Sequence, residues 1–385
     1  MEASHGASHV YGIERHTLCL APVVADAARN RFVLGTLGIT EPSEIHLVDF
    51  DSDRGALHGL VYRHPCGVRA LASVPWDPAQ LLVVGSGTGP PGAPPAALVA
   101  LPDVPEDMAP GAGGLERATA HVAPLGVAPP EDQPLPHAVV CHPAAHCREA
   151  ATVSGASVQI WDFAPAGPTA AHAIAAARHA MDDIEAAAWH PADPARLATA
   201  DGMCVRAWDT RAEPRRQQTA VIEYAHSGKA RCLDFNPNLP YMLATGGDDG
   251  SVRIWDMRSP SAAVVDIANH THWVYSVAFN PGHDQLLLSA GGDGLVNLER
   301  AAAVSSAQVI SAQDSDAKGS DSDSDSPAAG AGAADGLVAQ FDDHETSVYA
   351  TRWSAGDSWI FASLSFGGRM VINAVPQEEK YKILL

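Results

Sequence analysis

The stretch HSGKARCLDFNPNLPYMLATGGDDGSVRIWD, from His226 to Asp256, decides the fold of this chain. It holds two short apolar runs with a period of two, which are joined by a Gly-Gly-Asp-Asp-Gly turn and end on Trp-Asp. Alternating runs joined by a Gly/Asp turn predict a β-hairpin, and a closing Trp-Asp is typical of one blade of a β-propeller. This stretch is the unit that the rest of the chain repeats.

Seven copies of the unit follow one another along the 385 residues. Trp161, Trp208 and Trp255 close three of them at an equal spacing of 47 residues, near the ~40–45 residues of a WD40 repeat. The first copy has Val48 at the aligned Trp position, and the sixth has Glu299. The repeats predict an all-β, seven-bladed WD40 β-propeller with four antiparallel strands in each blade. After an N-terminal tail over residues 1–10, the propeller is expected over 11–385, with blades at about 11–63, 64–127, 136–175, 181–223, 226–267, 270–341 and 344–385.

An acidic segment interrupts the sixth copy. Residues 304–336 include DSDAKGSDSDSDSPAAGAGAADG, which is too polar and acidic to pack into a core. We therefore expect a disordered insert here, with the fourth strand of blade six at Leu337 to Phe341. Serine alternates with aspartate in the insert, as in substrates of acidophilic kinases, and the alternative is an unmodified solvated spacer. The candidate phosphorylation sites are Ser320, Ser322, Ser324 and Ser326.

The ends of the chain decide how the ring closes. If each blade holds its own four strands, Tyr381 to Leu385 forms the last strand of blade seven, and the ring closes by packing that blade against the first. The alternative is closure by strand exchange, in which residues 1–14 supply a strand to blade seven.

The composition limits the partners and the compartment. The formal net charge of −21 and the pI near 5.1 argue against a nucleic-acid backbone or an anionic membrane as the main partner, because both need a basic face. No apolar run has the ~18 residues of a membrane span, and Met1 to Ser8 lacks the features of a signal peptide. The six cysteines are scattered without a CxxC pair, so we expect them to be reduced. These features predict a soluble cytoplasmic protein.

Two repeats carry a histidine, a hydroxyl and a carboxylate at matching positions, which resembles a catalytic triad. In WD repeats these positions form a buried hydrogen-bond chain, and a fully satisfied network offers no free nucleophile. We therefore interpret the sets as structural and expect no catalytic residue. The third, fourth and seventh copies have Gly155, Gly202 and Gly367 in place of the turn aspartate, so these blades are expected to rest on apolar packing alone. The structural sets are His226, Thr245, Asp249 and Trp255 in the fifth copy, and His270, Ser289 and Asp293 in the sixth.

Possible zinc ligands lie close together in CHPAAHC, from Cys141 to Cys147. The paired CxxC and HxxxH spacings of zinc sites are missing, and the run falls where the repeat unit has Phe235-Asn236-Pro237. Alternation along a strand explains it, so no metal site is expected. The glycine-rich run Gly85 to Gly89 lacks the GxxxxGK[ST] pattern of a phosphate-binding loop, and no cofactor is expected.

Arginine follows the closing Trp-Asp in two copies. Trp208 to Arg211 and Trp255 to Arg258 both read WDxR, which resembles the motif with which propeller receptors dock on the DDB adaptor of cullin ubiquitin ligases. The alternative is an exposed ion pair between each arginine and a nearby carboxylate, which often contributes almost nothing to stability. A substrate receptor of a cullin ligase is therefore the second functional hypothesis for this chain.

Several segments go beyond a generic WD repeat and together closely resemble the EARP- and GARP-interacting WD-repeat proteins. The resemblance spans about Tyr11 to Leu385, and its most specific parts are His272-Trp273-Val274, His283 to Leu288 and Lys380 to Leu385. The chain departs from the family at Gly367 and in the Ala-, Pro- and Gly-rich second and third blades. The matching segments are YGIERHTLCLAPVVAD (11–26), RFVLGTLGITEPSEIHLVDF (31–50), AHSGKARCLDFNPNLPYMLATGGDD (225–249), HTHWVYSVAFNPGHDQLLLS (270–289) and HETSVYATRWSAGDSWIFASLSFGGRMVINAVPQEEKYKILL (344–385).

The resemblance implies a function and a location. It implies a non-enzymatic adaptor for the multisubunit tethering complexes of endosomal recycling and endosome-to-Golgi retrograde transport. It also implies a monomeric propeller within a larger complex, cytoplasmic and peripheral at endosomes and the trans-Golgi network, without an integral membrane segment. The expected partner-binding residues are His272, Trp273 and Tyr381, with Arg211 and Arg258 from the WDxR motifs.

Overall fold

The repeat unit folds into a four-stranded antiparallel sheet, which is blade five. Its strands are β19 (Ala230–Phe235), β20 (Met242–Gly247), β21 (Val252–Asp256) and β22 (Ala263–Ile267), in that order across the sheet. Every residue of β20 is buried, because this strand lies inside the sheet and between two blades. The outermost strand β22 alternates between partly buried and exposed residues, since only one of its faces meets the core.

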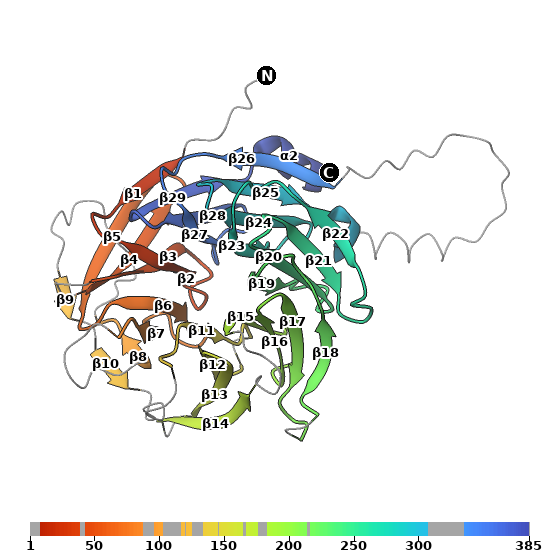
Figure 1. Ribbon diagram of the computed structural model, residues 1–385. Coiled ribbons are helices and arrows are strands. Elements are labelled where there is room, and N and C mark those ends of the chain that lie inside the picture. Colours follow the sequence, from red (N-terminus) through yellow and green to blue (C-terminus); the bar gives the residue numbers. More distant parts are fainter. Residues whose placement is uncertain are drawn as a thin grey trace.

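Seven such sheets form a ring in the computed structural model (Figure 1), which confirms the predicted seven-bladed β-propeller. The structure describes residues 8–38, 43–87, 96–102, 117–119, 121–124, 134–144, 146–164, 167–175, 183–213, 216–306 and 335–384. The expected phosphorylation sites at Ser320, Ser322, Ser324 and Ser326 lie outside the described residues, as does most of the expected insert. None of the described helices is long and apolar enough to cross a membrane.

The other blades repeat this plan, and their strands run from the innermost to the outermost in each case. Blade two has β6 (Val68–Ser73), β7 (Gln80–Gly85), β8 (Ala96–Ala100) and β10 (His121–Pro124). Blade three has β11 (Ala138–Cys141), β12 (Glu149–Ser154), β13 (Ser157–Ala164) and β14 (Gly167–Ala175). Blade four has β15 (Ile184–Trp189), β16 (Arg196–Asp201), β17 (Cys204–Asp209) and β18 (Gln218–Ile222). Blade six has β23 (Val274–Phe279), β24 (Leu286–Gly291), β25 (Val296–Arg300) and β26 (Gly336–Phe341).

Blade one has a fifth strand. Its four regular strands are β2 (Thr17–Pro22), β3 (Asn30–Thr36), β4 (Ser43–Asp51) and β5 (Ala56–His64). The short strand β9 (Arg117–Thr119) then pairs with β5 in the parallel direction. The segment between β8 and β10 of blade two therefore crosses to the edge of blade one, which covers an otherwise open strand edge.

The ring closes by strand exchange. Blade seven contains β27 (Val348–Trp353), β28 (Ile360–Ser365) and β29 (Arg369–Ala374), and its outermost strand is β1 (His9–Gly12) from the other end of the chain. His9 pairs with Ile372 and Gly12 with Arg369, and Figure 1 shows β1 beside β29. The expected tail over residues 1–10 is therefore wrong for its last two residues, which belong to this strand.

The expected last strand at Tyr381 to Leu385 is also wrong, because residues Gln377–Leu384 form helix α2. Glu378 and Glu379 lie in the first turn of this helix and Lys382 in its last turn, an arrangement that favours a helix through its dipole. The Glu379 carboxylate also forms a nearly buried ion pair with Arg300 at the end of β25. This pair holds the helix against blade six, where Figure 1 shows it next to β26.

The apolar cores lie between neighbouring blades. One cluster joins blades five and six through Ile254, Val274 and Leu287, and the equivalent clusters join each blade to the next. Gly246 is needed at such a contact, because a Cβ atom there would lie 2.6 Å from Val274 Cγ1 and 2.8 Å from Cys232 Sγ. None of the six cysteines forms a disulfide, and four of them are buried.

Candidate functional site

The two ends of the ring differ, and one of them is marked by backbone bulges. A register shift at the second residue interrupts six of the innermost strands that the structure describes: β2, β6, β15, β19, β23 and β27. We call the end at which these strands begin the bulge end. The turns between the second and third strands lie at the same end, since the amide of Gly292 donates to the carbonyl of Trp273, just before β23.

The polar set of blade five forms one continuous hydrogen-bond chain. Trp255 Nε1 donates to Thr245 Oγ1 at 3.0 Å, and this hydroxyl lies 2.9 Å from Nε2 of His226. Nδ1 of His226 lies 2.9 Å from Oδ1 of Asp249. Because a carboxylate only accepts, Nδ1 carries the proton, and Nε2 accepts from the threonine. The four residues that the sequence grouped together therefore do meet in space.

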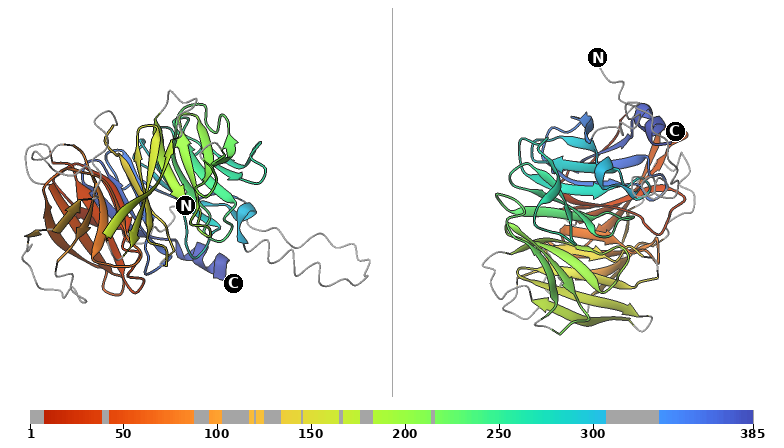
Figure 2. Two further views of the ribbon diagram at one scale, coloured as in Figure 1. Left: turned by 90° about the horizontal axis from the view of Figure 1, so that it is seen from below. Right: turned by 90° about the vertical axis from the view of Figure 1, so that its right-hand side faces the viewer.

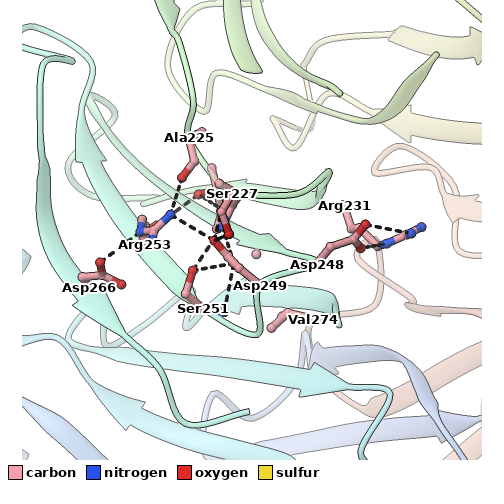
Figure 3. Close-up of polar contacts among 12 residues, drawn as sticks. Ala225, Ser227, Arg231, Asp248, Asp249, Ser251, Arg253, Asp266 and Val274 are labelled. Carbon is pink, nitrogen blue, oxygen red and sulfur yellow. Dashed lines mark hydrogen bonds and ion pairs between the residues drawn. The ribbon is translucent and has the colours of Figure 1, made fainter. Parts of the chain in front are cut away.

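Asp249 is the last acceptor of this hydrogen-bond chain and lies at the bulge end. Burial opposes its ionisation, but hydrogen bonds from Ser251, the Ser227 amide and His226 outweigh burial and hold its pKa well below the usual range. Burial lowers the pKa of His226 despite this carboxylate, so the imidazole is neutral near pH 7. Figure 3 shows Asp249 between Ser227, Ser251 and Arg253, so its oxygens are used within the turn.

Burial decides what these sets do chemically. The side chains of Thr245 and Ser289 have no exposed surface. A substrate carbonyl therefore has no path to either hydroxyl, although each lies 2.9 Å from a histidine nitrogen as in a triad. The geometry supports the structural interpretation of both sets.

The expectation that blades three, four and seven rest on apolar packing alone is wrong, because the described residues of each blade keep at least part of the hydrogen-bond chain. Trp161 and Trp208 donate through Nε1 to Thr152 and Thr199, each at 2.9 Å. In blade seven, Nε2 of His344 lies 2.8 Å from the hydroxyl of Ser363. The hydroxyl on the second strand is thus the member that remains in every one of these blades.

In blade six, the buried carboxyl group of Glu299 stands at the position that the tryptophan of the hydrogen-bond chain occupies in blade five. Nδ1 of His270 lies 3.0 Å from Asp293, and Nε2 lies 2.9 Å from Ser289, as in blade five. Glu299 itself is fully buried, and Asn269 donates to one of its oxygens at 3.4 Å. Burial raises the pKa of Glu299 to about 7, and its hydrogen bonds with Asn269 and Ser289 offset only part of this effect.

Glu299 makes the stability of the protein depend on pH in a defined direction. Its folded pKa of about 7 lies above the ordinary 4.5, so the folded protein favours the neutral carboxyl group over the carboxylate. The contribution of neutral Glu299 to the free energy of unfolding is therefore complete below pH 4.5 and is lost as the pH rises through 7. Replacing Glu299 by Gln removes the ionisation. We expect the variant to be more stable than the native chain at pH 8, by up to about 3 kcal/mol, and equal to it near pH 4.5. Urea unfolding at both pH values measures this, and an equal difference at both would contradict it.

The CHPAAHC run does not gather metal ligands. His142 packs edge-on against Trp189, with ring centroids 5.7 Å apart, and burial raises the pKa of the Cys141 thiol to about 12. Among the residues that the structure describes, no three His, Cys, Asp or Glu side chains are placed to hold a metal ion.

The two WDxR arginines lie at the end opposite the bulge end. Arg211 bonds Asp209 at 2.8 Å and Asp193 at 3.0 Å, and Arg258 bonds Asp256 at 2.6 Å. Both side chains remain about 60% exposed. Between these blades lies a cavity of about 240 Å³ lined in part by Trp208, Phe235, Tyr241 and Arg258.

Trp273 and His272 lie at the bulge end, where Trp273 is 40% exposed. The Arg231 guanidinium lies 4.4 Å from the centre of the Trp273 ring, and Asp248 pairs with this arginine. Figure 3 shows Arg231 and Asp248 beside Val274, the residue that follows Trp273. Arg231 was not among the residues singled out from the sequence, although its place after the first residue of β19 is the place of Tyr275 in β23.

Tyr381 and the His283 to Leu288 run lie at the opposite end of the ring. Tyr381 is 61% exposed on α2, and the neighbouring Lys380 lies 5.6 Å from the centre of the Trp359 ring. The same Trp359 ring stacks on His283, with ring centroids 4.0 Å apart. The expected partner-binding residues therefore do not form one surface, and Figure 2 shows α2 at one side of the ring.

Comparison with known proteins identifies relatives along almost the whole chain. The family model described as EIPR1 beta-propeller matches residues 5–298. EARP and GARP complex-interacting protein 1 of Rattus norvegicus is 32% identical over 384 residues, which cover 98% of each chain. EARP-interacting protein 1 of Caenorhabditis elegans is 32% identical over 384 residues, covering 97% of this chain and 98% of that one. WD repeat-containing protein DWA2 of Arabidopsis thaliana is 29% identical over 371 residues, covering 95% of each.

These matches confirm the resemblance seen in the sequence. They extend over the degenerate first blade as well as the regular ones. Together with the seven-bladed ring, they show that the chain belongs to the EIPR1 β-propeller family of EARP- and GARP-interacting WD-repeat proteins.

Proposed function

We propose that this chain is a non-enzymatic WD-repeat adaptor that binds the EARP and GARP complexes and supports endosomal recycling and endosome-to-Golgi retrograde transport. The observation that carries the proposal is the match to relatives named for these complexes over 97% or more of both chains. The whole ring, and not one detachable blade, corresponds to those interacting proteins.

The geometry supports a scaffold more than a catalyst. The hydroxyl, imidazole and carboxylate groups of blades five and six are bonded to one another and buried, so they hold the blades together. Exposed aromatic side chains lie at both ends of the ring, Trp273 at one and Tyr381 at the other. Exposed aromatic side chains at two separate places suit a protein that holds two partners, or two parts of one complex, in a fixed relation.

The adaptor would act in the cytoplasm and reach endosomes and the trans-Golgi network through the complexes that it binds. The acidic chain, with a net charge of −21, is poorly suited to direct binding of an anionic membrane. We therefore propose a monomeric propeller whose membrane association is indirect.

Affinity purification from the chain's own cells tests the proposal. The tagged full-length protein is expected to retain tether subunits in near-stoichiometric amounts, as measured by quantitative mass spectrometry. Tyr381→Ala and Trp273→Ala remove exposed side chains at opposite ends, so their separate losses of subunits show which end is in contact. The proposal is sunk if no tether subunit is retained by the native protein.

The second candidate is a substrate receptor of a cullin ligase. It is favoured by one observation: Arg211 and Arg258 are exposed on adjacent blades at the same end of the ring. In this case Arg211→Asp combined with Arg258→Asp abolishes retention of the ligase adaptor in the same purification. A tethering factor retains its subunits in the double variant.

A further inference from the structure

The unpaired residues of the innermost strands touch one another around the bulge end. A β-bulge leaves one residue without a partner in the ladder and redirects its side chain. In four consecutive blades these residues are Glu185, Arg231, Tyr275 and Tyr349. Arg231 lies 3.9 Å from Glu185 and 5.7 Å from the centre of the Tyr275 ring, and Tyr275 stacks on Tyr349 with centroids 4.4 Å apart. Side chains from separate blades thus form a continuous row.

Aromatic rings extend this row on both sides. Trp273 covers Arg231 at 4.4 Å, and the Tyr349 ring lies 5.8 Å from Phe366, which stacks on His16 with centroids 4.4 Å apart. We call this set the aromatic arc: Arg231, Trp273, Tyr275, Tyr349, Phe366 and His16. It crosses blades five, six, seven and one, so no single repeat contains it.

The arc is held in place and partly open to solvent. Trp273 is 40% exposed, His16 is exposed, and the other three rings are half-buried. Asp248 pairs with Arg231, which fixes the guanidinium under the Trp273 ring. An aromatic side chain that is already ordered loses little entropy on binding, which is the property of an interface anchor.

The charges beside the arc select the partner. Three basic side chains at the bulge end are each paired with a carboxylate: Lys229 with Glu185 at 2.6 Å, Arg369 with Glu345 at 3.6 Å, and Arg15 with Glu44 at 3.7 Å. In contrast, three exposed carboxylates in the loops leading to the innermost strands form no ion pair with any described residue: Glu14, Asp183 and Asp342. The exposed Arg69 of blade two, which lies outside the arc, forms no ion pair with a described residue. The arc is therefore an aromatic surface within an acidic rim, on a chain with a net charge of −21.

We propose that the aromatic arc binds an extended segment of a protein partner that carries arginine or lysine beside apolar residues. The apolar side chains pack on Trp273 and the half-buried tyrosines, and the cations meet the unpaired carboxylates and ring faces. This proposal rests on the adaptor function, because it describes the chemistry of the segment that an assembled complex presents to the ring.

A defined peptide set tests the chemistry directly on the full-length protein. The probe is a fluorescein-labelled dodecapeptide of repeating Gly-Leu-Arg, compared with the Gly-Leu-Gln and Gly-Leu-Glu versions by fluorescence anisotropy. We expect the arginine peptide to bind, the glutamine peptide to bind at least about tenfold more weakly, and the glutamate peptide not to bind. Affinity for the arginine peptide falls as salt rises from 50 to 300 mM, because paired charges are screened.

Matched variants place the peptide on the arc. Trp273→Ala and Tyr349→Ala are expected to weaken binding of the arginine peptide about tenfold each. Tyr224→Ala removes a more exposed tyrosine outside the arc and is expected to leave binding unchanged. Thermal melts verify that Trp273→Ala folds, as its exposure leads one to expect. The arginine and glutamine peptides binding equally, or Trp273→Ala binding like the native chain, overturns the proposal.

Other occupants give different outcomes. Preference for the glutamate peptide shows an acidic partner, and dimerisation abolished by Trp273→Ala in analytical ultracentrifugation shows a second copy of this chain on the arc; either result overturns the proposal. The adaptor function fails separately, since it is decided by retention of tether subunits by the native protein. If the native protein retains tether subunits but peptide binding does not depend on Trp273, the adaptor function is supported and the proposed binding of a partner segment by the aromatic arc is contradicted.

Discussion

Replacing Gly368 by Ala is expected to lower the free energy of unfolding by about 3 kcal/mol, a large effect for one added methyl group. Gly368 has a φ of +84°, which L-residues rarely adopt, and a Cβ atom there would overlap the carbonyl oxygens of Ile13 and Arg15. The carbonyl of Gly368 also accepts from the Ile13 amide at 2.9 Å. Strain of ~1–2 kcal/mol and the loss of about one backbone hydrogen bond account for the size.

The neighbouring Gly367 is the matched control for this substitution. A Cβ atom there would meet only the Thr346 side chain, at 3.3 Å, and its φ lies outside the left-handed region. Gly367→Ala is therefore expected to change the free energy of unfolding by less than about 0.5 kcal/mol. Urea unfolding followed by circular dichroism measures both. Equal effects of the two substitutions would show that the turn does not support the closing segment.

Replacing Thr245 by Val is expected to destabilise the protein by about 3 kcal/mol, because one hydroxyl serves two partners. It accepts from Trp255 Nε1 at 3.0 Å and lies 2.9 Å from His226 Nε2. Valine has the same shape but leaves a buried donor and a buried acceptor without partners, at about 1–3 kcal/mol each before the structure relaxes. The loss is measured by urea unfolding at pH 7, where His226 is neutral.

Thr199 in blade four gives the control, since among the residues that the structure describes its hydroxyl bonds Trp208 and no histidine. Both threonines are fully buried, so the two Val substitutions bury the same new methyl group. Thr199→Val is expected to have about half of the effect of Thr245→Val, roughly 1–2 kcal/mol. If Thr199→Val were as damaging as Thr245→Val, the imidazole would contribute nothing to the chain of hydrogen bonds.

The sequence predicts the ring well because its signals are local and repeated. The Trp-Asp endings at Trp161, Trp208 and Trp255 and the Gly/Asp turns each specify a hairpin without reference to the rest of the chain. The polar set of blade five is predictable for the same reason. His226, Thr245 and Asp249 recur at fixed offsets within one repeat, and β20 and its neighbours bring them together.

The two ends of the chain were harder to predict, because short apolar runs fit more than one structure. Residues Tyr381 to Leu385 read as a strand by composition, but the preceding Gln377 to Lys380 favour a helix that docks through Glu379. The strand at His9–Gly12 has only four residues, and its partner lies more than 350 residues away. The strand at His9–Gly12 and its partner β29 come together only when the ring closes.

The aromatic arc could not be predicted from the pattern of one repeat. Its members come from different blades, and the bulges that turn them toward one another are features of backbone register. The signal that was present is the residue type at one position. Arg231, Tyr275 and Tyr349 each follow the first residue of an innermost strand, where an all-β core would be expected to place small or apolar side chains.

Closure by β1 also determines when the ring can close while the protein is being synthesised on the ribosome. Its pairing partner β29 (Arg369–Ala374) is synthesised more than 350 residues after β1. At ~5–20 residues per second, the strand at His9–Gly12 waits roughly 20 to 70 s on the ribosome before its partner exists. During that time blade seven is not yet available to pack against blade one. The apolar face of blade one that will contact blade seven is therefore exposed to chaperones and to other nascent chains. In a circularly permuted chain that begins at β2 and carries β1 after β29, β1 would be made after its pairing partner and would not have to wait for it.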